Sequence, residues 1–171
     1  MQIVIRMARK GDGKAAVECW NAGVAAGFRK YTGSIGLRTY KDAKRWDKFY
    51  ADGKKGGFVF VALDKNNGKI VGLVSFGAKE KGRSRHRGEL GWSVHPDYAR
   101  IGIATKLVKR VLVEARKRGF KRAEAEAAAE NLSSVKLAKK CGFKIEGKRK
   151  AGLLLDDGRY VDSYLFGKIL R

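Results

Sequence analysis

The sequence has few of the residues that mark metal proteins, disulfide-bonded proteins and multidomain chains. Its two cysteines, Cys19 and Cys141, lie far apart without a metal-ligand neighbour at a useful spacing, and we interpret them as buried thiols in a reducing compartment. The only histidines are His86 and His95, so we expect no zinc site and no other metal. The chain has one proline, no Pro/Ser-rich stretch and no internal repeat, and residues 1–171 are therefore expected to form a single domain.

Long apolar segments are also missing. No apolar run approaches the roughly 18 residues that a membrane-spanning helix needs. The N-terminal stretch MQIVIRMARKGD has no long apolar region of the kind found in a signal peptide. We therefore expect a cytoplasmic protein without a membrane partner.

Acidic residues are scarce relative to basic ones, since 17 Asp and Glu stand against 39 Lys and Arg, for a formal net charge of +22. The excess is not confined to a tail, because Lys79–Arg87, Lys106–Arg122 and Lys136–Lys150 are each strongly basic. Such a field attracts polyanions, which include RNA, DNA and a phosphate-rich cofactor. The other interpretation is a surface that only keeps the protein soluble.

The most informative stretch runs from Glu89 to Gly119. Glu89–Val94 has the pattern of a short strand, which Pro96 ends because proline donates no ladder hydrogen bond. The loop Ala99–Thr105 then opens a long helix, and Gly119 stands where a glycine commonly ends one. The apolar residues of this helix fall on one face: Ile103, Leu107, Val108, Val111, Leu112 and Ala115. A strand, a glycine-containing loop and a helix N-terminus present free backbone N–H groups to a phosphate or pyrophosphate. Because one glycine is a weak signal, the alternative is a plain strand–turn–helix without a ligand.

Hydrophobic periodicity divides the rest of the chain into further strands and helices. The expected strands are 2–7, 57–63, 69–78, 143–150 and 159–168, and the expected helices are one after residue 12, 39–51 and 131–141. Asp12 is expected to cap the first helix, and Asn67-Gly68 predicts a hairpin turn. The glycine-rich segment Gly27–Arg38, with Phe28 and Tyr31, is expected to form either a flexible loop or the wall of a substrate cleft.

The segment Arg122–Ala129 gives two conflicting signals. Its alanine and glutamate content favours a helix, whereas the alternation of Glu124 and Glu126 with alanines is typical of a strand. Because Gly119 has just ended one helix and Asn131 is a good N-cap for another, we predict a strand.

This order of elements, together with two motifs, resembles the GNAT superfamily of acyl-CoA N-acyltransferases. One motif is V-x-P-x-Y-x-x-x-G-I-A at Val94–Ala104, and the other is N-x-x-S-x-x-L-x-x-K-x-G-F at Asn131–Phe143. The C-terminal part is most similar to the branch that holds ribosomal-protein N-terminal, polyamine and herbicide-detoxifying (phosphinothricin-type) acetyltransferases. The resemblance implies an α+β fold, with a central mixed and mostly antiparallel sheet of about six or seven strands flanked by about four helices.

The resemblance also implies acetyl-CoA as the co-substrate, with its pyrophosphate in the loop and its pantetheine arm along the strand end Ser93-Val94, which would splay from the next strand. The residues expected to bind it are Ser93, Val94, Arg100, Ile101, Gly102, Ile103, Ala104, Thr105, Asn131 and Ser134. The close backbone approach that Gly102 permits and the charge of Arg100 suit this role. Two positions depart from the family pattern. Ala99 stands where Gln or Arg is usual, and Ala138 stands where many members have a tyrosine that protonates the departing thiolate.

The reaction that the resemblance implies is direct attack of a primary amine on the acetyl thioester. We expect Glu89 to remove the amine proton through water, the alternative being that it only balances Arg87, and His95 is a lesser candidate. A backbone N–H near Val94 would polarise the thioester oxygen. The candidate acids are Ser134, Tyr164 and Cys141. A CoA thiol, with a pKa of roughly 8.5 like that of free cysteine, leaves without a strong acid.

The amine acceptor stays open in the sequence. A protein N-terminus, for example on a ribosomal protein beside anionic rRNA, fits the charge of +22, and so does a small anionic amine. A polyamine or an aminoglycoside fits this charge less well unless acids line the cleft, the candidates being Asp42, Asp47, Asp156 and Asp157. The alternative function is a nucleic-acid- or ribosome-associated binding module on a GNAT fold with little or no turnover. Many relatives dimerise, so a homodimer is also among the expected assemblies.

Overall fold

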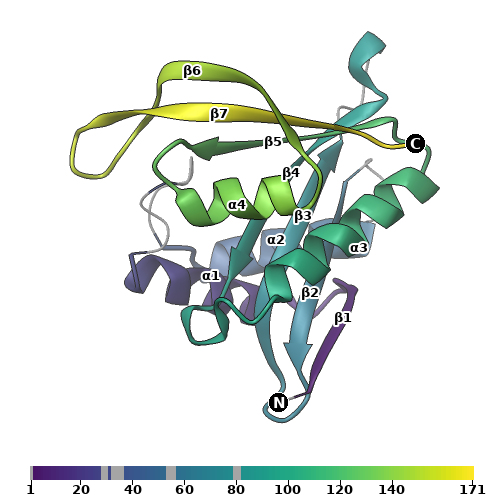
Figure 1. Cartoon of the computed structure of the whole chain (residues 1–171). Helices are drawn as coiled ribbons and strands as arrows, with labels where there is room; N and C mark the ends of the chain where they lie inside the picture. The colour runs from purple at the N-terminus through teal and green to yellow at the C-terminus, as the bar shows by residue number, and fades with distance from the viewer. Residues whose placement is uncertain (1, 28–30, 32–36, 53–56, 79–81) are drawn as a thin grey trace.

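The structure is a computed structural model that describes residues 2–27, 31, 37–52, 57–78 and 82–171. Most of the glycine-rich segment Gly27–Arg38, including Phe28, and the start of the basic turn at Lys79 lie outside the described residues. Figure 1 shows the elements in the order that the sequence predicts. They are β1 (Ile3–Met7), α1 (Gly13–Ala25), α2 (Tyr40–Asp52), β2 (Phe58–Asp64), β3 (Lys69–Ala78), β4 (Arg87–Val94), α3 (Ile103–Lys117), β5 (Arg122–Ala128), α4 (Leu132–Lys140), β6 (Lys144–Leu154) and β7 (Tyr160–Ile169).

The strands form a seven-stranded sheet in the order β1-β2-β3-β4-β5-β7-β6. Only the neighbours β4 and β5 run parallel, and every other pair is antiparallel. The predicted mixed, mostly antiparallel sheet with four long helices is therefore confirmed. The strand prediction for 122–129 is confirmed as well, since β5 pairs with both β4 and β7.

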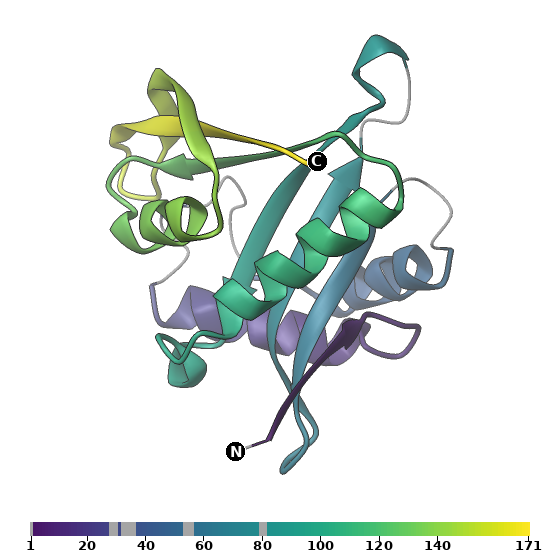
Figure 2. The same ribbon diagram turned by 45° about the vertical axis from the view of Figure 1, so that its right-hand side comes forward.

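Helices cover both faces of the sheet (Figures 1 and 2), with α3 and α4 on one face and α1 and α2 on the other. The alternation of side chains along β2 builds both interfaces. Phe58 and Phe60 belong to the large core under α3 and α4, whereas Val59 and Val61 pack against α1. Both halves of the core are apolar, which fixes the register of the central strands.

Glycines end the two helices on the front face of Figure 1. Gly119 follows α3 with a φ of 86°, and Gly142 follows α4 with a φ of 83°. In each case the next residue, Phe120 or Phe143, donates its N–H back to a carbonyl of the last helical turn, at 3.0 Å and 3.1 Å. Both helices thus end in a Schellman motif, and the prediction for Gly119 is confirmed.

The predicted cap of α1 is wrong. Asp12 stands at the N-cap position, but its side chain makes no capping hydrogen bond. Its carboxylate instead pairs with Arg6 of β1, at 2.6 Å, and accepts the N–H of Arg9. Asp47 of α2 takes over the cap, because its Oδ1 accepts the N–H of Gly13 at 2.7 Å. A charge-assisted pair with a neighbouring strand has displaced the local bond.

Candidate active site

The site begins where β4 and β5 separate. These parallel strands pair only from Arg87 to Glu89 on β4 and from Arg122 to Glu124 on β5. Beyond that point β4 remains paired with β3 and β5 with β7, so the two strands open like a V. A cleft of about 450 Å³ lies in the opening. The splay that the resemblance implied at the end of β4 is therefore present.

Charged side chains fasten the two strands at the closed end. Arg87 of β4 and Arg122 of β5 each donate to Oε1 of Glu124 at 2.8 Å, and Arg122 also pairs with Glu146 of β6. Burial alone would raise the pKa of Glu124, but the hydrogen bonds from Arg122 and Arg87 outweigh it and hold that pKa below its usual value. These ion pairs therefore fix the place at which β4 and β5 begin to separate.

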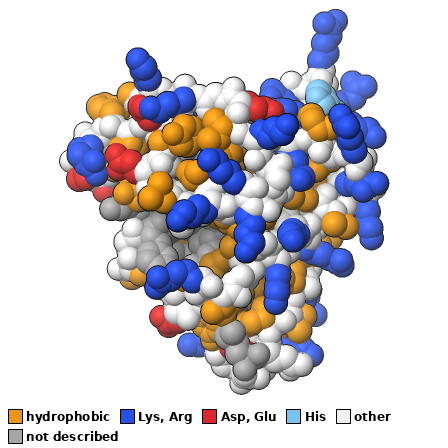
Figure 3. All heavy atoms as spheres, viewed as in Figure 1, with side chains coloured by type: hydrophobic (Ala, Val, Ile, Leu, Met, Phe, Trp, Pro, Cys, Tyr) orange, Lys and Arg blue, Asp and Glu red, His pale blue; other side chains and the backbone are white. Residues whose placement is uncertain are grey.

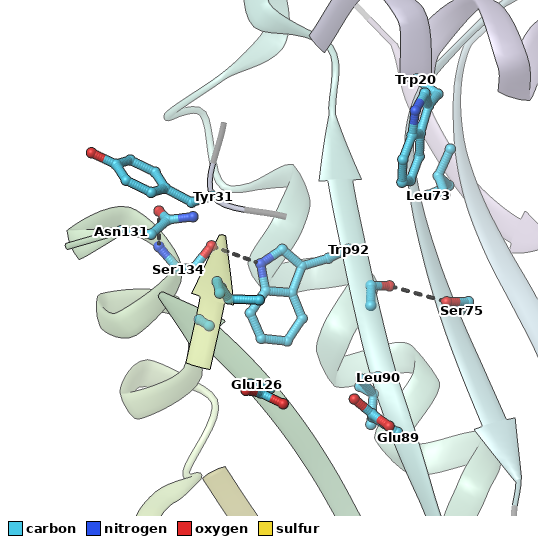
Figure 4. A pocket seen from close by; sticks show the side chains of 13 residues that line it. Trp20, Tyr31, Leu73, Ser75, Glu89, Leu90, Trp92, Glu126, Asn131 and Ser134 are labelled. Atoms are coloured by element: carbon cyan, nitrogen blue, oxygen red, sulfur yellow. Dashed lines mark hydrogen bonds between the residues drawn. The ribbon is translucent and has the colours of Figure 1, made fainter. Parts of the chain in front are cut away.

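The lining of the cleft combines aromatic walls with carboxylates (Figure 4). An apolar wall is formed by Trp20 of α1, by Leu73 of β3 and by Tyr31, and two acids are added by Glu89 and Glu126. In Figure 4 the two carboxylates lie on one side of the indole of Trp92, and Trp20 and Leu73 lie on the other. Tyr31 of the glycine-rich segment thus lines a cleft, as one of the two interpretations of that segment had it.

The two carboxylates differ in their partners. Glu126 accepts the hydroxyl of Ser163, and both of its oxygens accept Nη1 of Arg149 at 2.9 Å. Glu89 is exposed and makes no hydrogen bond or ion pair in the part of the chain that the structure describes. The alternative that Glu89 balances the charge of Arg87 is wrong, because Arg87 pairs with Glu124 instead. Glu89 therefore holds a negative charge that is open to a ligand.

The N-terminus of α4 forms the opposite wall. Asn131 caps this helix, since its Oδ1 accepts the N–H of Ser134 at 3.2 Å. Trp92 of β4 reaches across the opening and donates its Nε1 proton to Oγ of Ser134, also at 3.2 Å (Figure 4). The hydroxyl hydrogen of Ser134 has no acceptor among the described residues, so it is available to a ligand in the cleft.

The loop before α3 has the geometry of an anion site. Arg100 and Gly102 adopt left-handed conformations, with φ of 63° and 87°, and Gly102 is the N-cap of α3. The first backbone hydrogen bond of the helix comes from Lys106 to the Gly102 carbonyl. The N–H groups of residues 101–105 accordingly donate to nothing in the described chain, and they point out of the positive end of a helix.

Three other predicted candidates lie outside the cleft lining. Tyr164 of β7 pairs with β5 and packs edge-on against Phe166, with 6.3 Å between the ring centroids. His95 uses Nδ1 to accept the N–H of Asp97 at 3.3 Å, which ends the strand. Cys141 is buried, and burial raises the pKa of its thiol. The structure brings Glu89 and Ser134 together in one cleft, and it does not bring these three there.

The acids that would have favoured a polyamine are also elsewhere. None of Asp42, Asp47, Asp156 and Asp157 is among the residues that line the cleft. Asp42 accepts the N–H of Thr39 at the start of α2, Asp47 caps α1, and Asp157 pairs with Arg159. In the described ranges, no three His, Cys, Asp or Glu side chains gather to hold a metal ion. No helix there is long and apolar enough to cross a membrane.

Sequence reasoning missed Trp20, Trp92 and Glu126 as lining residues. Trp20 belongs to α1 and lies at the part of that helix that meets the cleft. Glu126 lies two positions after Glu124, the last residue of β5 that pairs with β4, so it lies on the same face of that strand as Glu124. The signal for it was the alternation that predicted the strand.

A parallel strand pair that opens beside a helix N-terminus with free N–H groups is the arrangement that the resemblance to acyl-CoA-dependent transferases implied. The comparison with known proteins gives the family. Residues 23–143 match the Acetyltransferase (GNAT) family, and the chain belongs to it.

The relatives agree on the activity. The chain is 31% identical over 140 residues to the L-amino acid N-acyltransferase MnaT of Escherichia coli (strain K12), covering 81% of this chain and 78% of that protein. Among solved structures, the ribosomal-protein-alanine N-acetyltransferase from Brucella melitensis superposes with a TM-score of 0.83 at 26% identity, over 98% of this chain and 99% of that one. The yncA acetyltransferase from Salmonella typhimurium, solved with its cofactor acetyl-CoA, gives 0.82 at 27% identity, over 99% and 94%. The protein is an acetyl-CoA-dependent N-acetyltransferase that acts on a primary amine.

Proposed function

We propose that the acceptor is the amino group of a small molecule of the amino-acid type, acetylated in the cleft between β4 and β5. The observation that carries this proposal is the unpaired carboxylate of Glu89 in a cleft of about 450 Å³ walled by Trp20, Tyr31 and Leu73. A cavity of this size suits a small ligand. The relative MnaT, named for action on L-amino acids, supports the same class of acceptor.

The observed geometry supports the roles that the motifs predicted for the cofactor residues. The free N–H groups of residues 101–105 would bind the pyrophosphate of acetyl-CoA, and Arg100 would add charge. The edge of β4 from Leu90 to Val94, which has no strand beside it on the β5 side, would hold the pantetheine arm by backbone hydrogen bonds. A backbone N–H near Val94 would then polarise the thioester oxygen.

The chemistry needs one base and at most a weak acid. Glu89 takes a proton from the ammonium group of the acceptor through water, which leaves a neutral amine. The amine nitrogen forms a bond to the thioester carbon, the carbon–sulfur bond breaks, and the second proton of the nitrogen passes to the departing sulfur, directly or through the Ser134 hydroxyl. Ser134 stands across the cleft with a hydroxyl hydrogen to offer the departing sulfur. The proposal includes a cytoplasmic location, which two buried cysteines that are not joined in a disulfide support.

An acceptor panel tests the proposal. Purified protein and acetyl-CoA would be mixed with free L-amino acids, their α-amides, short peptides with an N-terminal alanine, and spermidine, and the released thiol would be measured. We expect kcat/KM to be highest for free amino acids, at least about tenfold above the peptides, because a cleft of about 450 Å³ suits a small acceptor better than a peptide chain. Preference for the peptides would overturn the proposal in favour of a protein N-terminus. Preference for spermidine would overturn it in favour of a polyamine.

A further inference from the structure

The exposed surface of α3 and α4 carries many positive charges and almost no negative ones. The basic residues of these two helices, which we call the α3–α4 basic face, are Lys106, Lys109, Arg110, Arg116, Lys117, Lys136, Lys139 and Lys140. All of them are exposed. Figure 3 shows Lys and Arg side chains gathered over α3 and toward the end of α4.

Among the described residues, no acid compensates this face. Glu114 is the one acidic residue in α3, α4 has none, and Glu114 is already bound to Arg118 at 2.8 Å. The acids of β5 and β6 are also committed, because Glu124, Glu126 and Glu146 all pair with arginines of the sheet. None of the residues of the α3–α4 basic face forms an ion pair within the described chain.

The positive charges also converge where the two helices meet. Burial raises the pKa of the Cys141 thiol, and the charges of Lys109 of α3, Lys168 of β7 and Lys140 of α4 all oppose that rise. Nζ of Lys168 lies directly over Gly142 at the end of α4. Like charges held together in this way repel one another, and an anionic partner would relieve the repulsion.

We propose that the α3–α4 basic face binds the phosphate backbone of double-stranded RNA. Basic residues follow α3 from Lys106 to Lys117, a length of about 17 Å at 1.5 Å per residue, which matches several successive phosphates. The face has no exposed aromatic side chain on which unpaired bases could stack, so it suits a duplex better than a single strand.

The packing of α3 decides between the two kinds of duplex. Its apolar side, including Leu107 and Val111, is fully buried against the sheet, so the helix lies flat and cannot enter the major groove of DNA. Flat surfaces that contact phosphates across a wide and shallow groove are typical of duplex RNA recognition. The basic face does not depend on the proposed acceptor, because Lys109, Arg116 and Lys140 do not line the cleft.

Two triple variants with the same change of charge test the proposal. One is Lys109→Glu with Arg116→Glu and Lys140→Glu on the basic face. The other is Lys41→Glu with Arg45→Glu and Lys48→Glu on the exposed side of α2, which covers the opposite face of the sheet. Binding to an RNA duplex of about 16 base pairs would be measured by fluorescence anisotropy at several salt concentrations. The thermal shift with acetyl-CoA would report the fold and the cleft independently.

We expect the wild type and the α2 variant to bind alike, and the basic-face variant to bind at least about tenfold more weakly, with a salt slope shallower by about 2.7 at roughly 0.9 per lost phosphate contact. All three proteins should keep the acetyl-CoA shift. No binding by the wild type at low salt would overturn the proposal. Equal losses in both variants would overturn it too, because net charge alone would then be responsible. Tighter binding to duplex DNA or to polyglutamate of equal charge would show a different partner.

Discussion

Replacement of Gly88 by alanine should destabilise the closed end of the cleft. A Cβ atom at this position of β4 would lie 2.3 Å from Cε1 and Cζ of Phe76, and 3.0 Å from the carbonyl oxygen of Gly77. Carbon atoms pack best about 3.5–4.0 Å apart, so the ring would have to move by more than about 1 Å. Phe76 is fully buried, stacked on Phe58 at 5.1 Å and tilted against Phe120 at 4.8 Å, and it has no space to move into.

Overpacking of this kind costs about 1–3 kcal/mol, and the short contact places Gly88→Ala near the upper end. For a chain of this length, about 3 kcal/mol lowers Tm by roughly 6–12 °C. Gly77→Ala is the matched control, because its Cβ would meet only a carbonyl oxygen at 3.8 Å. Urea unfolding and a thermal melt would compare the two variants with the wild type. Equal stability of the Gly88 and Gly77 variants would refute the packing argument.

Three further predictions concern the cleft. Glu89→Gln should lower kcat/KM by about 10²–10⁴ without changing Tm, because the carboxylate has no partner to lose among the described residues. The control Glu18→Gln, on the exposed side of α1, should change neither kcat/KM nor Tm. An unchanged rate for Glu89→Gln would show that Glu89 is not the base. Gly102→Val should raise KM for acetyl-CoA and reduce its thermal shift, because a φ of 87° disfavours a β-branched residue. Glu124→Gln should destabilise the protein at pH 7 by about 1–2 kcal/mol. Since the pKa of Glu124 is lowered in the folded state, its contribution to stability is fully present above the unfolded pKa of about 4.3 and is lost as the pH falls through the folded pKa. The free energies of unfolding of wild type and variant should therefore converge in acid. A difference between them that stays constant down to acid pH would contradict this origin.

The sequence predicted the elements best where a local pattern determines them. The Asn67-Gly68 signal lies in the turn between β2 and β3, where Gly68 has a φ of 70° and donates to the Asp64 carbonyl. Gly119 ends α3 as expected, because only a residue that tolerates positive φ fits there. The failure at Asp12 has the opposite cause. Its carboxylate had a choice between a local cap and Arg6, and only the three-dimensional placement of β1 decided it.

The site was predictable to the extent that it follows from motifs in one stretch of chain. The loop before α3 and the N-cap at Asn131 were placed correctly by spacing alone. The cleft itself arises from strand pairing, which a single sequence does not show. Whether Glu89 or Glu124 takes Arg87 depends on the register of two parallel strands, and that register left Glu89 unpaired. Trp20 could not be assigned to the cleft because β4 and β5, between which the cleft lies, follow its helix by more than sixty residues of chain.

Ala138 stands where many members of the family have the tyrosine that protonates the departing thiolate. Ser134 supplies a hydroxyl near that part of α4 instead. Ala138 is buried, and Ser134 lies one helical turn earlier on the same side of the helix, where it accepts the Trp92 N–H. A hydroxyl polarised by an indole donates more readily than an isolated one. A thiol leaving group with a pKa of roughly 8.5 needs only such a weak donor. Ser134→Ala should therefore lower kcat more than it changes KM for acetyl-CoA, whereas Ser133→Ala, whose hydroxyl donates to Asn131 at 2.8 Å, should leave both unchanged. Equal losses in the two variants would mean that hydrogen bonding at the start of α4, rather than proton donation, supports turnover.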